Sequence, residues 1–252
     1  MEYVNLTPLI SCIRNVMIKL PVTYEVIIVD DYSGDGSDHL CSDLSKTNPL
    51  LYVSRKSKKR SLSLAVLEGL RVSTGQLIVV MDADLSHPPD KLPQMLNKLL
   101  RNEADFVIGS RYVKGSIVES VWPWYRRINS YVATAISNVF FSYVLNEKLI
   151  GRLQDPMAGF FSFKRECLCE LDNLSPIGYK ISLELLVKGN FSTIVEVPIH
   201  FADRKFGTSK LGFKQQILYL VHLLQLFDSK YPRKYSVAFV LILVMLICIW
   251  LL

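Results

Sequence analysis

The chain has 252 residues, of which 50% are hydrophobic and 21% charged. This composition suits one large α/β domain with an appendage and excludes an intrinsically disordered chain. A formal net charge of +6 favours anionic partners, namely nucleic acid, an anionic membrane surface or a phosphorylated ligand. The five cysteines form no CxxC pair and no zinc-like spacing, so we expect reduced thiols and no structural zinc site.

Strand-like and helix-like segments alternate along the first half of the chain. Short apolar runs predict strands, and apolar residues at helical spacing predict helices. Strands are expected at 25–29, 50–53, 76–80 and 104–109, and helices at about 4–20, 37–44, 62–72 and 90–101. Such alternation predicts a mostly parallel, doubly wound sheet flanked by helices.

Two carboxylates, Asp82 and Asp84, follow the apolar run 77–81. The carboxyl edge of an open α/β sheet is where ligands bind. Two close carboxylates repel each other unless a cation neutralises them, and Mg²⁺ or Mn²⁺ together with a ligand's phosphates suits such a pair. The alternative is a polar turn at a strand end, because Asp-x-Asp is short and common.

Charged residues also follow two other predicted strands. Asp30 and Asp31 end one strand and Arg111 follows another, so we expect them at the same edge as Asp82 and Asp84. The run 55–60 holds five cations in six residues and reads either as a solvated loop or as an anion-binding segment. Because it lacks interleaved aromatic residues, we do not expect nucleic acid as a partner.

The second half of the chain ends in a strongly apolar tail. Residues 235–252 carry no charge, and eighteen residues of helix span about 27 Å. Basic residues directly before this tail favour a cytoplasmic position for that flank. We therefore expect an α/β domain over 1–212, an amphipathic or interfacial helix with a basic linker over 213–234, and a transmembrane segment over 235–252. A further long apolar helix at 128–145 fits either the core or the membrane interface.

Several motifs resemble those of family 2 glycosyltransferases. Within that family, they look most like the motifs of dolichol-phosphate (polyprenyl-phosphate) mannose synthases of the archaeal type. The motifs stand in the order of that family: Val29-Asp-Asp31, Met81-Asp-Ala-Asp-Leu-Ser-His-Pro-Pro89, Gly109-Ser-Arg-Tyr112, Asp155-Pro-Met-Ala-Gly-Phe160 and Arg204-Lys-Phe-Gly-Thr-Ser-Lys-Leu211. The resemblance covers residues 3–215. It implies that the α/β domain is a glycosyltransferase domain with a GT-A fold, a Rossmann-like sheet flanked by helices, with C-terminal amphipathic helices and a transmembrane helix.

The resemblance also implies roles for individual residues. Asp30 or Asp31 would contact the nucleotide, and Asp82 and Asp84 would hold Mg²⁺ or Mn²⁺ at the donor diphosphate. Ser86 stands where relatives place another metal contact. The remaining implied contacts are with the acceptor phosphate, at Arg111, Arg126 and Ser130, and with the donor phosphates, at Arg204 and Lys210.

The implied reaction is an inverting transfer of mannose from GDP-mannose to dolichyl or polyprenyl phosphate at the cytoplasmic face of a membrane. A phosphate acceptor is nucleophilic without deprotonation, so no Ser-His-Asp triad is needed, and none is evident. Two alternatives remain open. One is the same reaction with UDP-glucose or another donor, and the other is a catalytically inactive relative that acts as a membrane-bound binding subunit.

The chain departs from the family pattern at two places. Relatives begin with a strand before the first helix, whereas this sequence starts at or beyond the end of that strand, which would leave two sheet edges unpaired. Ser61 stands where relatives often have Gly, and it would be strained if that position requires a positive φ.

Overall fold

The computed structural model describes residues 3–56, 60–119, 124–144, 153–202 and 213–230. The α-helices within these ranges are α1 (Tyr3–Met17), α2 (Ser37–Ser45), α3 (Leu62–Val72), α4 (Leu92–Leu100), α5 (Trp124–Val144), α6 (Ile181–Lys188) and α7 (Phe213–Lys230). Short 3-10 helices are η1 (Pro89–Lys91), η2 (Arg165–Cys167) and η3 (Leu171–Asn173). The strands are β1 (Val26–Asp30), β2 (Leu50–Ser54), β3 (Leu77–Val80), β4 (Phe106–Ser110), β5 (Ile117–Val118), β6 (Phe161–Lys164), β7 (Ile194–Pro198) and β8 (His200–Phe201).

The strands form separate sheets rather than the continuous, mostly parallel sheet that the sequence predicted. β1 pairs with β2 in parallel, and a second sheet has the order β3-β6-β4-β7. In that sheet β6 runs antiparallel to both β3 and β4, whereas β4 and β7 are parallel. The direction of β6 was not predictable, because the short segment Phe161–Lys164 carries no pattern that distinguishes a parallel from an antiparallel strand.

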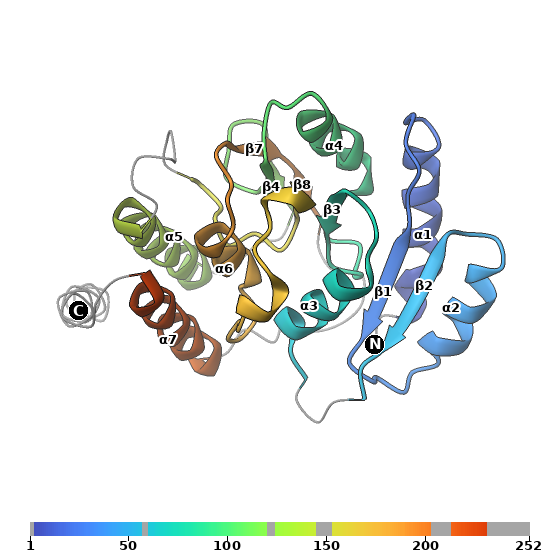
Figure 1. Ribbon diagram of the computed structural model, residues 1–252, viewed down its shortest axis with the longest axis horizontal. Coiled ribbons are helices and arrows are strands. Elements are labelled where there is room, and N and C mark those ends of the chain that lie inside the picture. The colour runs from blue at the N-terminus through green and yellow to red at the C-terminus, as the bar shows by residue number, and fades with distance from the viewer. Residues whose placement is uncertain (1–2, 57–59, 120–123, 145–152, 203–212, 231–252) are drawn as a thin grey trace.

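Apolar cores lie on both faces of the four-stranded sheet. On one face, rings of Phe106, Phe163 and Phe191 pack together with centroids 5.0–5.8 Å apart, and α6 contributes buried side chains to this core. On the other face, α1 and α4 pack against Val107 and Phe160. The sheet is therefore covered by helices on both sides (Figure 1).

Helix α1 begins at Tyr3, more than one turn before Pro8. Proline is most common in the first turn of a helix, so Pro8 alone would suggest a later start. Pro8 lies inside the helix, although proline removes one i→i−4 hydrogen bond. The buried side chains of Leu6, Leu9 and Ile10 lie on both sides of the proline. Their burial accounts for a helix that continues through Pro8.

The two longest helices, α5 and α7, lie side by side. The Tyr219 hydroxyl of α7 donates to the backbone carbonyl of Ala133 in α5, and both helices lie at the end of the molecule opposite β1 and β2 (Figure 1). Within the described ranges, no helix is both long enough and apolar enough to cross a membrane. The predicted span at 235–252 lies outside the described residues.

Candidate active site

The turn after β3 holds the predicted carboxylate pair. Asp84 is buried, and its Oδ1 accepts hydrogen bonds from the Ser86 hydroxyl (2.6 Å) and the Ser86 backbone N–H (3.0 Å). Ser86 is fully buried, and its hydroxyl orients Asp84. Leu85 between them has φ 65°, an unusual conformation for a branched residue that concentrates at functional sites.

His87 fixes the same turn from inside the protein. Its Nδ1 accepts a hydrogen bond from the backbone N–H of Asp82 at 2.9 Å, and its Nε2 lies 4.0 Å from the Asp82 carboxylate. The ring stacks on Phe160. Burial lowers the pKa of His87 although Asp82 and Asp84 oppose that shift, so the neutral imidazole acts as a hydrogen-bonded support.

The carboxylates suit a divalent cation that a ligand also coordinates. Asp82 retains 27% side-chain exposure, and a Cβ added to Gly159 would stand 3.8 Å from each Asp82 carboxylate oxygen. The glycine therefore leaves that carboxylate open. Within the described part of the chain, no three His, Cys, Asp or Glu side chains lie close enough together to hold a metal ion by themselves.

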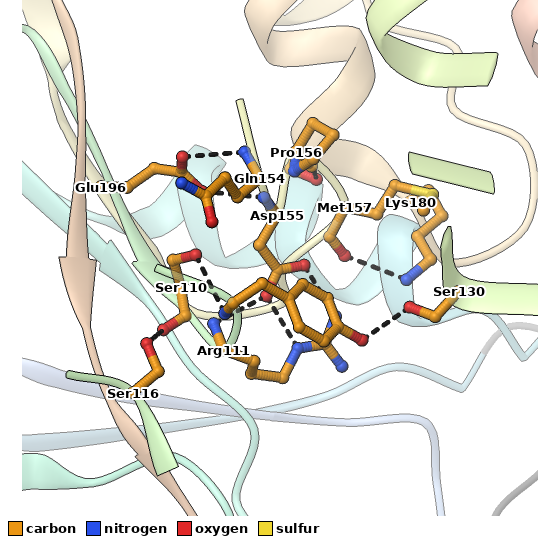
Figure 2. Close-up of polar contacts among 12 residues, drawn as sticks. Ser110, Arg111, Ser116, Ser130, Gln154, Asp155, Pro156, Met157, Lys180 and Glu196 are labelled. Carbon is orange, nitrogen blue, oxygen red and sulfur yellow. Dashed lines mark hydrogen bonds and ion pairs between the residues drawn. The ribbon is translucent and has the colours of Figure 1, made fainter. Parts of the chain in front are cut away.

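A buried ion pair lies at the end of β4. The Asp155 carboxylate accepts hydrogen bonds from Arg111 Nε and Nη2, both 2.8 Å, and from the Arg111 backbone N–H at 3.0 Å (Figure 2). Glu196 of β7 in turn accepts from the backbone N–H groups of Gln154 and Asp155, both at 2.8 Å. Burial disfavours the Arg111 cation, but Asp155 more than offsets it and raises the pKa of Arg111.

Lys180 adds a second, partly buried cation to this site. Its Nζ donates to the carbonyl of Met157 at 2.9 Å and lies 4.6 Å from the Tyr179 ring centroid. Burial and the Arg111 charge lower the pKa of Lys180 to about 8, against the attraction of Asp155 and Asp82. Lys180, Arg111 and the carboxylates therefore act on one another electrostatically.

Ser130 also lies in this cluster. Its hydroxyl is 2.6 Å from the Tyr112 hydroxyl, and Figure 2 shows Ser130 and Lys180 on the same side of the Arg111–Asp155 pair. Tyr112 directly follows Arg111. The structure thus brings the predicted residues Arg111 and Ser130 together with a lysine that the sequence did not single out.

The end of β1 carries the other two predicted carboxylates. Asp31 binds the Arg55 guanidinium and accepts from the Ser61 backbone N–H at 2.7 Å. Asp30 accepts from the Tyr52 hydroxyl (3.1 Å) and from Ser33, all on Oδ2. Asp31 thus serves as a connection between β1 and the loop before α3.

This loop shows no strain at Ser61. Its backbone is extended, with φ −161° and ψ 125°, a conformation open to any residue, so the replacement of glycine costs nothing there. Arg55, the first cation of the basic run, is largely buried against Asp31. At least this member of the run is part of the fold rather than of a solvated loop.

Some predicted residues lie beyond the described structure. Arg204 and Lys210 fall outside the described residues, and α5 places Arg126 in its first turn without a described side chain. Asp155, Lys180 and His87 are site residues that sequence reasoning gave no role. Asp155 belongs to one of the family motifs, but only the fold shows that it faces Arg111.

Curated relatives carry one shared name. The chain is 39% identical to the "Dolichol-phosphate mannosyltransferase" of Pyrococcus furiosus over 225 residues, covering 89% of this chain and 60% of that protein. Proteins of the same name from Mycosarcoma maydis and Saccharomyces cerevisiae are each 34% identical, with 99% and 86% of this chain covered and 83% and 79% of theirs. The chain therefore spans little more than half the length of the Pyrococcus protein.

A solved structure and a family model both match the α/β domain of this chain. Glucosyl-3-phosphoglycerate synthase from Mycobacterium tuberculosis, solved with Mn²⁺, uridine-diphosphate-glucose and phosphoglyceric acid, superposes with a TM-score of 0.61 at 17% identity, covering 89% of this chain and 75% of that one. This likeness identifies the GT-A glycosyltransferase fold. The model of "Glycosyl transferase family 2" matches residues 2–171. The chain belongs to glycosyl transferase family 2 and carries a glycosyltransferase domain.

Proposed function

We propose that this protein transfers mannose from GDP-mannose to the phosphate of a dolichyl or polyprenyl phosphate, with inversion at the anomeric carbon. The observation that carries the proposal is the arrangement of two partly buried cations, Arg111 and Lys180, whose charges act on Asp82 and Asp155. The reaction brings together a diphosphate leaving group and a phosphate nucleophile. Such a site must hold both anions without a general base.

The donor is assigned to the edge formed by β1 and β3. We choose Asp30 rather than Asp31 as the nucleotide contact. The hydrogen bonds to Asp30 all fall on Oδ2, whereas both carboxylate oxygens of Asp31 already accept hydrogen bonds within the protein. Asp82 and Asp84 would hold the divalent cation, with Ser86 orienting Asp84 or adding a ligand of its own. When bound, the cation would neutralise charge on the leaving diphosphate. The predicted contacts from Arg204 and Lys210 remain part of this proposal.

The acceptor is assigned to the end of β4. Arg111 is held by Asp155, and Ser130 and Tyr112 present hydroxyl groups beside it, while Arg126 adds a cation by prediction. A guanidinium fixed before the ligand arrives loses little entropy on binding phosphate. An acceptor phosphate oxygen would attack the anomeric carbon as its bond to the diphosphate oxygen breaks, and GDP would leave. No proton transfer is required.

A membrane location completes the proposal. A polyprenyl acceptor resides in the bilayer, and we place the catalytic domain at the cytoplasmic face with residues 235–252 as its anchor. The α5–α7 pair exposes Tyr131, Ile217 and Val221, apolar surface that suits the membrane interface. The observation that favours the second candidate, a non-catalytic binding subunit, is that β1 and β3 each have a strand partner on one side only among the described residues.

Calorimetric titration of the purified chain with each nucleotide sugar tests which donor binds more tightly. We expect GDP-mannose to bind in the presence of Mn²⁺ at least about tenfold more tightly than UDP-glucose, and EDTA to weaken the binding. Asp30→Asn is the matched variant, and Asp172→Asn on the exposed η3 turn is its control. Tighter binding of UDP-glucose would assign the other donor. Absence of nucleotide-sugar binding would favour the non-catalytic subunit.

A further inference from the structure

The segment 153–157 carries Asp155 but belongs to no helix or strand. All of its residues except Gln154 are buried. Buried backbone groups need hydrogen-bond partners, and an irregular segment has no ladder of its own to supply them. The partners of this segment are side chains that come from α5, α6 with its N-cap, and β7.

The carbonyl groups at the two ends of the segment accept hydrogen bonds from side chains. The donors and their acceptors are Asn138 Nδ2 to Leu153 (2.8 Å), the Ser182 hydroxyl to Pro156 (3.2 Å) and Lys180 Nζ to Met157 (2.9 Å). These bonds fix the segment before and after Asp155. They do not involve the amide of Asp155 itself.

Glu196 binds the two N–H groups at the centre of the segment. Its Oε2 accepts from the Gln154 N–H and its Oε1 from the Asp155 N–H, both at 2.8 Å (Figure 2). Hydrogen bonds to an ionised acceptor are stronger than those between neutral groups, and two of them on successive amides hold the backbone in one orientation. Both oxygens of Glu196 are thus used to orient the backbone that carries the Asp155 side chain.

Glu196 and Arg111 are attached to the same pair of strands. β7 pairs with β4 in parallel, with Glu196 opposite Ile108, and Arg111 directly follows β4. The backbone ladder therefore fixes where Glu196 lies relative to Arg111. Asp155 is bound from both, because its amide donates to Glu196 and its carboxylate accepts from Arg111.

We propose that Glu196 is a positioning residue of the acceptor-phosphate site and that it acts on Arg111 through Asp155. The Glu196 carboxylate orients the backbone at Asp155, and the Asp155 carboxylate in turn directs the Arg111 guanidinium toward the phosphate. The assignment of Arg111 to the acceptor phosphate rests on the proposed function. The link from Glu196 to Arg111 rests on hydrogen bonds alone, so the two can be tested separately.

The test without substrate measures proton exchange at Arg111 Nε by NMR of the full chain, labelled with 15N-arginine, in detergent. This N–H donates to Asp155 at 2.8 Å, and Arg111→Lys identifies its signal by removing it. Glu196→Gln keeps the shape of the side chain but replaces one acceptor oxygen with an NH2 group, which would face a backbone N–H. We expect the Arg111 Nε–H to exchange at least about tenfold faster in this variant.

Two controls separate positioning from a general loss of stability. Arg165 Nε donates to a backbone carbonyl at 2.7 Å, and its exchange should stay within about twofold in Glu196→Gln. Asp105→Asn is the matched variant, because Asp105 also accepts from two successive backbone N–H groups, those of residues 192 and 193, at 3.0 and 3.1 Å. It should leave exchange at Arg111 Nε within about twofold.

In the transfer reaction, the effect should fall on one substrate. Glu196→Gln should raise KM for polyprenyl phosphate at least about fivefold and leave KM for GDP-mannose within about twofold, because the donor contacts are assigned to Asp30 and the Asp82–Asp84 turn. Asp105→Asn should change neither KM. A wild-type chain that transfers no sugar would refute the proposed reaction, and exchange at Arg111 Nε would still decide the role of Glu196.

Three results would overturn the proposal. Exchange at Arg111 Nε that is unchanged in Glu196→Gln means that Glu196 does not position the guanidinium. An equal acceleration at Arg111 and Arg165 means a general loss of stability, and an equal rise of both KM values means no specific role at the acceptor site. If Glu196→Gln does not fold, Glu196→Asp is measured in the same way, because it keeps the charge on a side chain one methylene shorter. Faster exchange at Arg111 Nε than in the wild type supports the proposal, and wild-type exchange refutes it.

Discussion

The Arg111–Asp155 pair gives the sharpest prediction about how the site is built. Asp155 is 1% exposed and Arg111 17% exposed at their side chains, and three hydrogen bonds join them. Asp155→Asn keeps the shape of the side chain but removes its charge. An amide offers one acceptor oxygen instead of two, so at least one charge-assisted bond is lost, at about 1.5–3 kcal/mol.

Loss of the counter-charge adds to this cost. Removing one partner of a buried ion pair costs about 3–5 kcal/mol, and the remaining Asn contact retains part of that. We therefore expect Asp155→Asn to lower the free energy of unfolding by about 3 kcal/mol and Tm by about 6–12 °C. Asp172→Asn, at an exposed position, should stay within about 0.5 kcal/mol.

A double-mutant cycle identifies the cause. Arg111→Met removes the cation, so the double variant should be less destabilised than the sum of the single variants, with a coupling energy of about 2 kcal/mol. Denaturant unfolding followed by circular dichroism measures all four proteins. Additive single effects, or an Asp155→Asn protein as stable as the wild type, would refute the account of Arg111 as a cation held in place by Asp155.

Three further predictions concern the site and the tail. Asp84→Asn should reduce metal-dependent sugar transfer by about 10²–10³-fold with Tm changed by only a few degrees; a normal rate in a transfer assay would exclude Asp84 from the metal site. Because the pKa of Lys180 is lowered to about 8 in the fold, the unfolded chain binds more protons between pH 8 and about 10. Stability of the wild type relative to Lys180→Met should therefore rise over that interval in denaturant titrations, and a flat difference would contradict the burial of a cation there. Removal of residues 235–252 should release the domain from membranes in sedimentation assays while transfer to a short, soluble acceptor continues; unchanged retention would move the anchoring role to α5 and α7.

The sequence predicted most of the elements that carry the site. The apolar runs before Asp30, Asp82 and Arg111 are strands β1, β3 and β4, and each predicted boundary lies within two residues of the observed one. These strand ends are readable because a charged side chain that follows a run of branched apolar residues is costly to bury, and therefore marks the point where a buried strand reaches its edge. The metal and acceptor roles of these residues stay predictions.

Other features depend on contacts between distant segments. Asp155 meets Arg111 across 44 positions, and Lys180 meets Met157 across 23, and no periodic pattern encodes such pairs. The antiparallel direction of β6 was hidden for the same reason, since its two neighbours come from earlier parts of the chain. The edges of β1 and β3 that lack a strand partner among the described residues, by contrast, were expected from the sequence.

The most direct test of the central claim is transfer of radiolabelled mannose from GDP-mannose into a polyprenyl phosphate by membranes that carry this chain, with Mn²⁺ or with EDTA. The account predicts a labelled lipid that forms with Mn²⁺, disappears with EDTA and is absent from membranes with the Asp84→Asn chain. Labelled lipid that forms equally in EDTA would contradict the metal site. No labelled lipid from GDP-mannose, in a chain that binds it, would contradict the proposed reaction.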